Sequence, residues 1–322
     1  MKKIMISIII LMIILTACFF LLNKKDNDTQ TIRILVSDGV SSAQLHVMEE
    51  LHLVEKYAPD TKVEFQVFYS GSAINEAFIA NQGDIASLGI ANFLTGLDKG
   101  ISYKVAAAVS HTRFGLQTNN PNIKSLKDIG PDDKIAVSSL TGIHGTLLKM
   151  ACEKELGDPD ALKDNIVVMD ASDAELALIN KSSGISLHMA EIANILRENR
   201  AGCPTILDNV DILGVRCTNM VTVASTDFAE NHPDLYNAYV SALEEATTLI
   251  NNRDEQALEI ISTTQNISKE EIIEYLDSDS LIFSTTKYNI LPITDFLYKI
   301  GQISIKIESL QDISFPNVTE TK

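Results

Sequence analysis

The sequence predicts an α/β protein with two halves of unequal size and a helical C-terminal region. Its 322 residues exceed the size at which single hydrophobic cores usually stop growing, about 250–300 residues. Its composition, 45% hydrophobic and 21% charged, is that of a globular protein. From residue 31 onward short apolar strand signals alternate with helical patterns of about ten to fifteen residues, which predicts βαβ units and mainly parallel sheets.

The first half contains β-branched and alternating runs that predict strands. These strands are expected at residues 31–36, 63–67, 85–88 and 103–109. Val47, Met48, Leu51 and Val54 recur at helical spacing, and Pro59 is expected to end that helix. A second helix is expected to begin at residues 70–72 and to end at Gly83.

The second half repeats the pattern. The expected strands are 114–118, 134–137, 166–169 and 184–187, and the expected helices are 143–156, 172–181 and 190–199. After a strand at 221–224 the chain is expected to be almost wholly helical. Pro233 marks one helix start, and the capping box at 268–271 marks another.

The N-terminus has the features of a targeting segment. Lys2 and Lys3 precede an apolar run at 4–14, and Leu-Thr-Ala at 15–17 precedes Cys18. This resembles the lipobox of bacterial lipoproteins, which implies a signal peptide over 1–17, lipidation of Cys18 and a tether over 18–30. Because the apolar run continues to residue 22, an uncleaved membrane-spanning helix is the alternative. Both readings place the rest of the chain outside the cytoplasm, attached to the membrane.

Charge and cysteine usage exclude several function classes. Lys and Arg number 26 against 43 Asp and Glu, a net charge of −17, and no basic patch is present, so nucleic-acid binding is not expected. Cys152, Cys203 and Cys217 are expected to be buried free thiols, although Cys203 and Cys217 could pair. No CxxC or Cys/His ligand spacing occurs, so neither a metal site nor a cofactor is expected.

Two stretches carry a family resemblance. VFYSGSAINEAFIANQGDIA at 67–86, and IKSLKDI at 123–129 followed by KIAV at 134–137, resemble ABC-transporter solute-binding proteins of the nitrate/sulfonate/taurine and thiamine-pyrimidine-precursor type. The resemblance covers about residues 31–310. The chain departs from the family pattern at 130–134, where a longer loop replaces Gly-Lys. It also departs at 184–188, where the acidic residue and the alanine of a family strand are absent.

The resemblance implies a type II periplasmic-binding-protein fold, with two lobes joined by two crossovers and a ligand cleft between them. The crossovers are expected near 110–112 and 217–219. Lobe 1 would then comprise 31–109 and 220–322, and lobe 2 would comprise 110–219. Such lobes close around a ligand by hinge bending.

Ligands of open α/β sheets lie beyond the carboxyl ends of the strands, so the loops between strands and helices are the expected site. Hydroxyls and glycines at helix starts offer N–H and O–H groups, although serine there also serves as an N-cap. His188 is expected to end a strand and face the cleft, with a structural histidine as the alternative, and Asn219 lies at the second expected crossover. The candidate ligand-binding residues are Asp38, Ser41, Ser42, Ser70, Gly71, Ser72, Gly89, Ser138, Thr141, Gly142, His144, His188 and Asn219.

The resemblance implies a monomeric solute receptor that serves an ABC permease and its ATPase, without catalysis. Hydroxyls at helix starts and the absence of Trp favour a small anionic organic solute, such as a sulfonate, nitrate or taurine. The alternatives are a binder of a thiamine pyrimidine precursor, an enzyme of the related pyrimidine-synthase type, and a module that docks on a sensor kinase. The enzyme would need a cysteine-rich active-site stretch and would lack an export signal. This sequence has scattered cysteines and a targeting-type N-terminus, which disfavours the enzyme.

Overall fold

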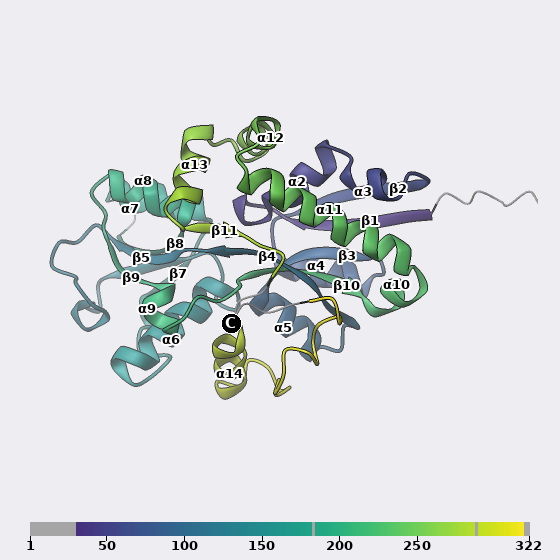
Figure 1. Cartoon of the computed structure of the whole chain (residues 1–322). Coiled ribbons are helices and arrows are strands. Elements are labelled where there is room, and N and C mark those ends of the chain that lie inside the picture. The colour runs from purple at the N-terminus through teal and green to yellow at the C-terminus, as the bar shows by residue number, and fades with distance from the viewer. Residues whose placement is uncertain (1–29, 182–183, 287–288, 319–322) are drawn as a thin grey trace, which may run out of the picture.

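The computed structural model describes residues 30–181, 184–286 and 289–318. They form an α/β protein with two mixed sheets (Figure 1). The expected signal peptide, Cys18 and the tether up to residue 29 lie outside the described residues. Among the helices that the structure describes, none is long and apolar enough to span a membrane.

The first sheet has six strands in the order β11-β4-β10-β3-β1-β2. Its strands are β1 (Gln30–Ser37), β2 (Thr61–Phe68), β3 (Ile85–Gly89), β4 (Tyr103–Thr112), β10 (Met220–Ser225) and β11 (Leu281–Phe283). Strand β1 pairs in parallel with β2 and β3, whereas β10 runs antiparallel to β3 and β4, and β11 runs antiparallel to β4.

The second sheet has five strands in the order β7-β6-β8-β5-β9. Its strands are β5 (Phe114–Thr118), β6 (Lys134–Val137), β7 (Ile166–Val168), β8 (Ile185–Glu191) and β9 (Thr205–Asp208). Strand β6 pairs in parallel with β7 and β8, while β5 runs antiparallel to β8 and β9.

The prediction of mainly parallel sheets was therefore wrong, because three of the five strand pairings in the first sheet and two of the four in the second are antiparallel. Parallel neighbours need a crossover of a dozen or more residues, and β1, β2, β3 and β6, β7, β8 have such connections. Strand β4, by contrast, passes into β5 of the other sheet through Arg113 alone, and the chain returns to the first sheet in β10. A strand that enters a sheet from the other sheet is not joined to its neighbour by a βαβ crossover, so it can pair in either direction.

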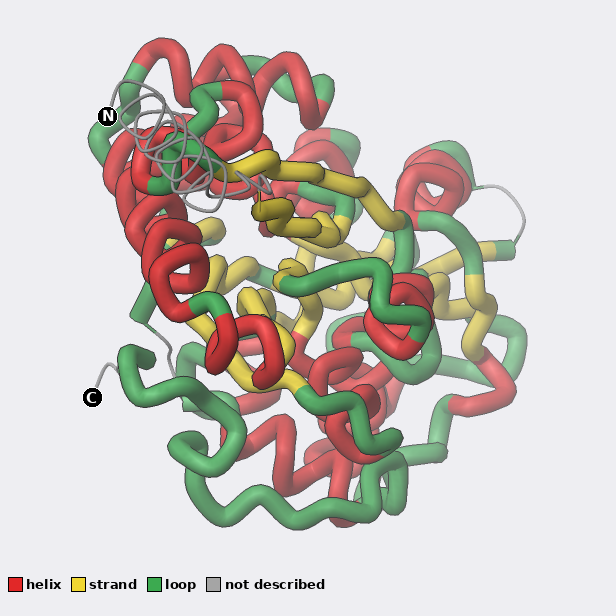
Figure 2. The backbone as a smooth tube through the Cα atoms, turned by 90° about the vertical axis from the view of Figure 1, so that its right-hand side faces the viewer, coloured by secondary structure: helices red, strands yellow, loops and turns green. Residues whose placement is uncertain are grey.

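Helices contribute to core layers on both faces of each sheet, and the tube view shows them around the strands (Figure 2). Their bounds are α2 (Ala43–Glu50), α3 (Leu53–Tyr57), α4 (Gly71–Ile79), α5 (Ile90–Asp98), α6 (Ile143–Leu156), α7 (Ala171–Ile179), α8 (Ile192–Arg200), α9 (Asn209–Leu213), α10 (Thr226–Asn231), α11 (Pro233–Asn251), α12 (Glu255–Gln265), α13 (Lys269–Asp277) and α14 (Leu291–Lys299), with 3₁₀ turns η1 (Val40–Ser42), η2 (Leu126–Asp128) and η3 (Lys163–Asn165).

Two helical expectations need correction. The single helix expected up to Pro59 is two helices, α2 and α3, because His52 between them adopts a left-handed conformation with φ of 50°. The C-terminal region also contains a strand, β11, and an irregular segment after α14, so it is less helical than expected.

The hydrophobic core has a layer on each face of each sheet. In the first sheet, α2, α3, α11, α12 and α13 contribute to one layer, and α4, α5 and α14 contribute to the other. Figure 1 shows α11 above this sheet and α5 and α14 below it. In the second sheet, α6 packs on one face and α7 on the other. Cys152, Cys203 and Cys217 are buried and free, so Cys203 and Cys217 do not pair.

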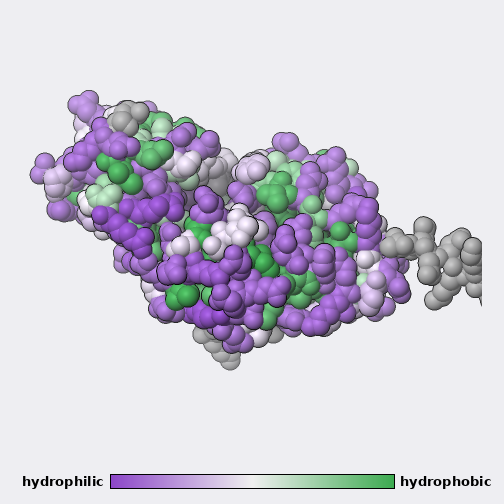
Figure 3. Space-filling view, turned by 90° about the horizontal axis from the view of Figure 1, so that it is seen from above, coloured by the Kyte–Doolittle hydropathy of each residue, from purple (hydrophilic) through white to green (hydrophobic). Residues whose placement is uncertain are grey.

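We call residues 30–112 and 220–318 the first part, and residues 114–213 the second part, according to the sheet that each builds. In the space-filling view the two parts lie side by side with a notch between them (Figure 3). They also contact each other directly: Ile192 of α8 is fully buried in the core of the first part, and Arg200 of α8 pairs with Glu274 of α13.

Candidate functional site

Polar side chains from both parts meet where the chain crosses between the sheets. Ser41 lies in η1, Thr112 ends β4, Glu191 ends β8, and Asn219 precedes β10. The Ser41 hydroxyl donates a hydrogen bond to the Glu191 carboxylate and lies 3.0 Å from the Thr112 hydroxyl oxygen. The Asn219 side-chain oxygen accepts the Thr112 backbone N–H at 2.8 Å. We call Ser41, Thr112, Glu191 and Asn219 the crossover cluster.

Local sequence explains how Ser41 reaches this place. Gly39 adopts φ of 118°, a conformation that favours glycine, and so turns the chain after β1 into the buried 3₁₀ turn. Ser42, directly after Ser41, is fully buried and donates to the Ser87 hydroxyl at 3.3 Å. Asp38 is exposed at the start of the same loop. Of these predicted residues, the structure therefore brings only Ser41 into the crossover cluster.

Two further predicted loops lie next to each other in the first part. A Cβ atom at Gly71 would overlap the Asn92 side chain, and one at Gly89 would lie 3.6 Å from the same side chain. The backbone oxygen of Asn219 accepts the Ile90 N–H at 2.9 Å, which links this loop to the crossover cluster.

The serines of the first of these loops are at the surface. Ser70 is the N-cap of α4, because its hydroxyl accepts the Ala73 N–H at 3.2 Å. Ser72 in the first turn is exposed. N-capping, the alternative to ligand binding at these serines, is thus observed at Ser70.

The predicted loop at 138–146 lies in the second part, at the start of α6. The Ser138 hydroxyl is 2.8 Å from Nδ1 of His144, and the His144 ring packs edge-on against Phe114 at a centroid distance of 5.0 Å. Thr141 is exposed, and its carbonyl accepts a hydrogen bond from Gln302 of the first part at 2.9 Å. The loop therefore contacts the first part through its backbone.

His144 is close to the crossover cluster through Phe114. Phe114 and Glu191 are directly paired residues of β5 and β8, so their side chains project on the same face of the sheet. Burial, reinforced by nearby His188, lowers the pKa of His144 to about 3. The imidazole is consequently neutral at physiological pH, so one ring nitrogen donates a hydrogen bond and the other accepts one.

Gly142 and Gly145 have different roles in this loop. Gly142 is the N-cap of α6, and its backbone N–H donates to the Ser139 hydroxyl at 3.1 Å. A Cβ atom at Gly145 would overlap the carbonyl oxygen of Leu140, so this glycine allows the loop to fold back onto the helix.

The expected position of His188 was wrong. Strand β8 continues to Glu191, so His188 lies inside the strand, is 1% exposed, and its Nδ1 is 2.6 Å from the Glu198 carboxylate on α8. His188 therefore fits the alternative expectation, a buried structural histidine. Glu191 was missed because the helix was expected to begin at residue 190, where a glutamate would be an ordinary solvated side chain. The available signal was an acidic residue at a strand-to-helix turn.

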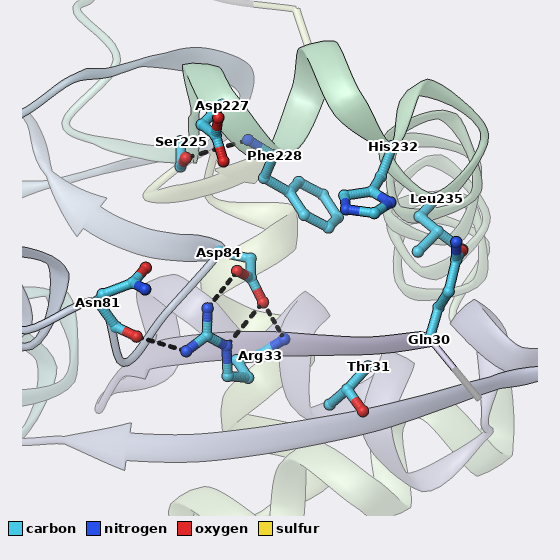
Figure 4. A pocket seen from close by; sticks show the side chains of 10 residues that line it. All are labelled: Gln30, Thr31, Arg33, Asn81, Asp84, Ser225, Asp227, Phe228, His232 and Leu235. Atoms are coloured by element: carbon cyan, nitrogen blue, oxygen red, sulfur yellow. Dashed lines mark hydrogen bonds and ion pairs between the residues drawn. The ribbon is translucent and has the colours of Figure 1, made fainter. Parts of the chain in front are cut away.

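A cavity in the first part lies away from the crossover cluster. It measures about 400 Å³ and is bounded by the start of β1, by Asp84 before β3 and by Ser225 at the end of β10. These positions are at the opposite end of the strands from the crossover cluster. In Figure 4 Arg33 and Asp84 point toward each other among the residues that line it, and their ion pair measures 2.6 Å. Arg33 is thus occupied by an internal carboxylate.

Within the described ranges, no three His, Cys, Asp or Glu side chains gather in a way that could hold a metal ion. Arg113, the basic residue at the first crossover, forms an ion pair with Asp208 at 2.8 Å. The arrangement thus offers hydroxyl, amide, imidazole and carboxyl groups to a small molecule.

Comparisons with solved structures show the same fold. The periplasmic aliphatic sulphonate binding protein SsuA of Escherichia coli is 18% identical with a TM-score of 0.72, and the match covers 92% of this chain and 95% of that one. The alkanesulfonate-binding protein SsuA of Xanthomonas axonopodis pv. citri, bound to MOPS, is 13% identical with a TM-score of 0.67, covering 86% and 94%. A Candida albicans protein described as having the generic periplasmic binding protein fold is 14% identical with a TM-score of 0.68, covering 91% and 98%.

The fold is therefore the two-lobed type II periplasmic-binding-protein fold expected from the sequence. Among curated protein sequences, none matches the chain. The sequence model described as NMT1/THI5 like matches residues 61–257, which is more than half of the chain. The chain belongs to the NMT1/THI5-like family.

Proposed function

We propose that this chain is an extracytoplasmic solute-binding lipoprotein that delivers a small organic solute to an ABC importer. The observation that carries the proposal is the meeting of loops from both parts at the two chain crossings, around Ser41, Thr112 and Glu191. A cleft at such a junction can close on a solute and exclude water. The two SsuA proteins are named for binding sulfonates, which supports a binding role without catalysis.

The proposed lobes are 31–109 with 220–322, and 110–219. Hinge bending at Arg113 and at residues 214–219 would open and close the cleft between them. The proposed ligand-binding groups are the loops 38–42, 70–72 and 89–90 on one side and 138–144 on the other. The protein would act as a monomer and dock on its permease, whose ATPase drives import.

The first candidates for the solute are sulfonate-, nitrate- and taurine-like compounds. Backbone N–H groups at the starts of α4 and α6 can bind an oxyanion, because these helix ends carry unpaired donors and partial positive charge. A thiamine pyrimidine precursor is the alternative that the sequence resemblance supplies.

The test is thermal unfolding of the full chain in detergent, followed by circular dichroism, with nitrate, taurine, alkanesulfonates and pyrimidine precursors. A solute at 100 times its Kd adds about 2.7 kcal/mol to the free energy of unfolding. We expect at least one class to raise the melting temperature without being consumed. Turnover of the solute, or no stabilisation by any class, would contradict the proposal.

Membrane attachment is tested separately. Lipidation at Cys18 predicts that cells fed a labelled fatty acid will label the wild-type chain and not Cys18→Ala. Equal labelling of both chains would contradict the lipoprotein assignment and favour an uncleaved N-terminal helix.

A further inference from the structure

The carboxylate of Glu191, at the start of α8, bonds to the other part of the protein and does not cap its own helix. Glu191 is the N-cap residue of α8, yet its side chain accepts no capping hydrogen bond from that helix. One oxygen instead accepts the hydroxyl of Ser41 in the other part. The second oxygen, Oε2, accepts no hydrogen bond from the described residues, and the side chain is only partly shielded from solvent.

No cation in the described part of the chain balances this carboxylate. Burial raises the pKa of Glu191 and the Ser41 hydroxyl lowers it, with no contribution from a Lys or Arg. Arg113, the basic residue nearest in sequence to the crossing strand, is held by Asp208. A partly buried carboxyl without a counter-charge is less favourable than a solvated one, and carboxyl groups with a raised pKa occur at functional sites.

The neighbours of Glu191 do not supply the missing donor. Since Ser41 gives its single hydroxyl proton to Glu191, the hydrogen bond between Ser41 and Thr112 must be donated by Thr112. His144, beside the paired Phe114, has its Nδ1 at the Ser138 hydroxyl, and Asn219 uses its side-chain oxygen to accept the Thr112 N–H. Among the described residues none donates to Oε2 of Glu191, so this oxygen can accept a donor from a bound solute.

We propose that Glu191 determines specificity by accepting N–H groups of an amino or ammonium group on the solute, which takes the place of the Ser41 hydroxyl. The inference rests on the proposed solute-binding function and narrows its substrate class. Nitrate and simple alkanesulfonates lack an N–H donor, so neither satisfies Glu191. A solute that also carries an acidic group could place that group at the helix starts of α4 or α6.

The experiment compares pairs of probes that differ in one amino group: taurine with ethanesulfonate, and β-alanine with propionate. Every compound that stabilises the chain in the wider screen is added to the set. Affinities are measured by calorimetry for the full chain, for Glu191→Gln and for Glu76→Gln. The substitution Glu191→Gln keeps the size of the side chain and an acceptor oxygen but removes the charge. Glu76 is exposed on α4 and serves as the control.

We expect the wild type to bind an amine-bearing probe at least about tenfold more tightly than its amine-free counterpart, because a hydrogen bond to a charged acceptor is stronger than one to a neutral acceptor. Glu191→Gln should lose about tenfold or more in affinity for that probe, and Glu76→Gln should not. Circular dichroism of the unliganded variants verifies folding.

Other outcomes separate the two proposals. If an amine-free compound binds as tightly as its partner, or if Glu191→Gln retains affinity, the role of Glu191 is overturned while solute binding stands. If no compound in the screen binds the wild type, solute binding fails, and the assignment of Glu191 fails with it.

Discussion

His144 is a neutral histidine at the start of α6, and its neutrality couples stability to pH. Its pKa is about 3 in the folded protein, mainly because of burial, against about 6.5 in an unfolded chain. Between these values the unfolded chain binds the additional proton. The stability that the neutral ring provides is therefore present above pH 6.5 and is lost as the pH falls.

The prediction is that His144→Gln loses less stability than the wild type between pH 7.5 and pH 5, by roughly 1–2 kcal/mol. His46 and His111 also have pKa values lowered by burial, but they are present in both proteins and cancel in the comparison. Urea unfolding at the two pH values gives the difference. Equal losses in the two proteins would contradict this account of His144.

Gly145 provides a second test at the residue scale. A methyl group there would overlap the carbonyl oxygen of Leu140, which belongs to the backbone and cannot rotate away. Gly145→Ala should destabilise the fold by roughly 1–3 kcal/mol. Gly130→Ala is the matched control, since its Cβ atom would make an ordinary contact of 3.5 Å with Asp133. If urea unfolding shows equal changes for the two variants, the loop does not pack on α6 as described.

At the scale of elements, the irregular segment after α14 is attached to another helix by a side chain. Ile303, Ile307 and Leu310 follow helical spacing and are buried, yet residues 303–308 have no regular structure. Asp98, the last residue of α5, accepts the Ser304 N–H at 2.7 Å and the Ile305 N–H at 3.0 Å. These donors are thereby held by a side chain distant in sequence.

Removing this acceptor should loosen the segment. We predict that trypsin cleaves Asp98→Ala after Lys306 several times faster than the wild type, since local opening exposes the backbone. Asp295→Ala on α14 is the control, because Asp295 is exposed on a neighbouring helix. Cleavage of both variants at the wild-type rate would show that Asp98 does not hold the segment.

Element prediction succeeded where the signal was local. The helix 143–156 and the strands 114–118 and 134–137 have the predicted bounds. Strands β9 and β11 were missed, because they are only four and three residues long and are stabilised by pairing with β5 and β4. The end of β8 was placed too early, which hid Glu191. A boundary error of four residues thus removed the acidic residue of the crossover cluster from the candidate set.

At the scale of the whole molecule, sheet direction and long-range contacts were beyond the sequence. Nothing local to β10 indicates that it enters between β3 and β4 in the antiparallel direction. The contact between Ser41 and Glu191 joins residues 150 positions apart, so it depends on how the two parts meet. The resemblance predicts crossovers near 110–112 and 217–219, a long-range feature that no local pattern supplies, and in the structure the chain passes between the sheets at Arg113 and between α9 and β10.

The central claim is that the two parts close on a small solute, and the separation of their outer strands tests it most directly. Tyr69 follows β2 and is 89% exposed, and Val168 ends β7 and is 54% exposed. Spin labels at Tyr69→Cys and Val168→Cys report the distance between the parts in the full chain, while the three native cysteines in the described part are buried. A control pair at Tyr69→Cys and Tyr298→Cys lies within the first part.

We predict that a saturating amount of the stabilising solute shortens and narrows the distance distribution between positions 69 and 168, and leaves that between 69 and 298 unchanged. An unchanged distribution between 69 and 168 with the solute bound would contradict the claim that the parts act as a hinged clamp.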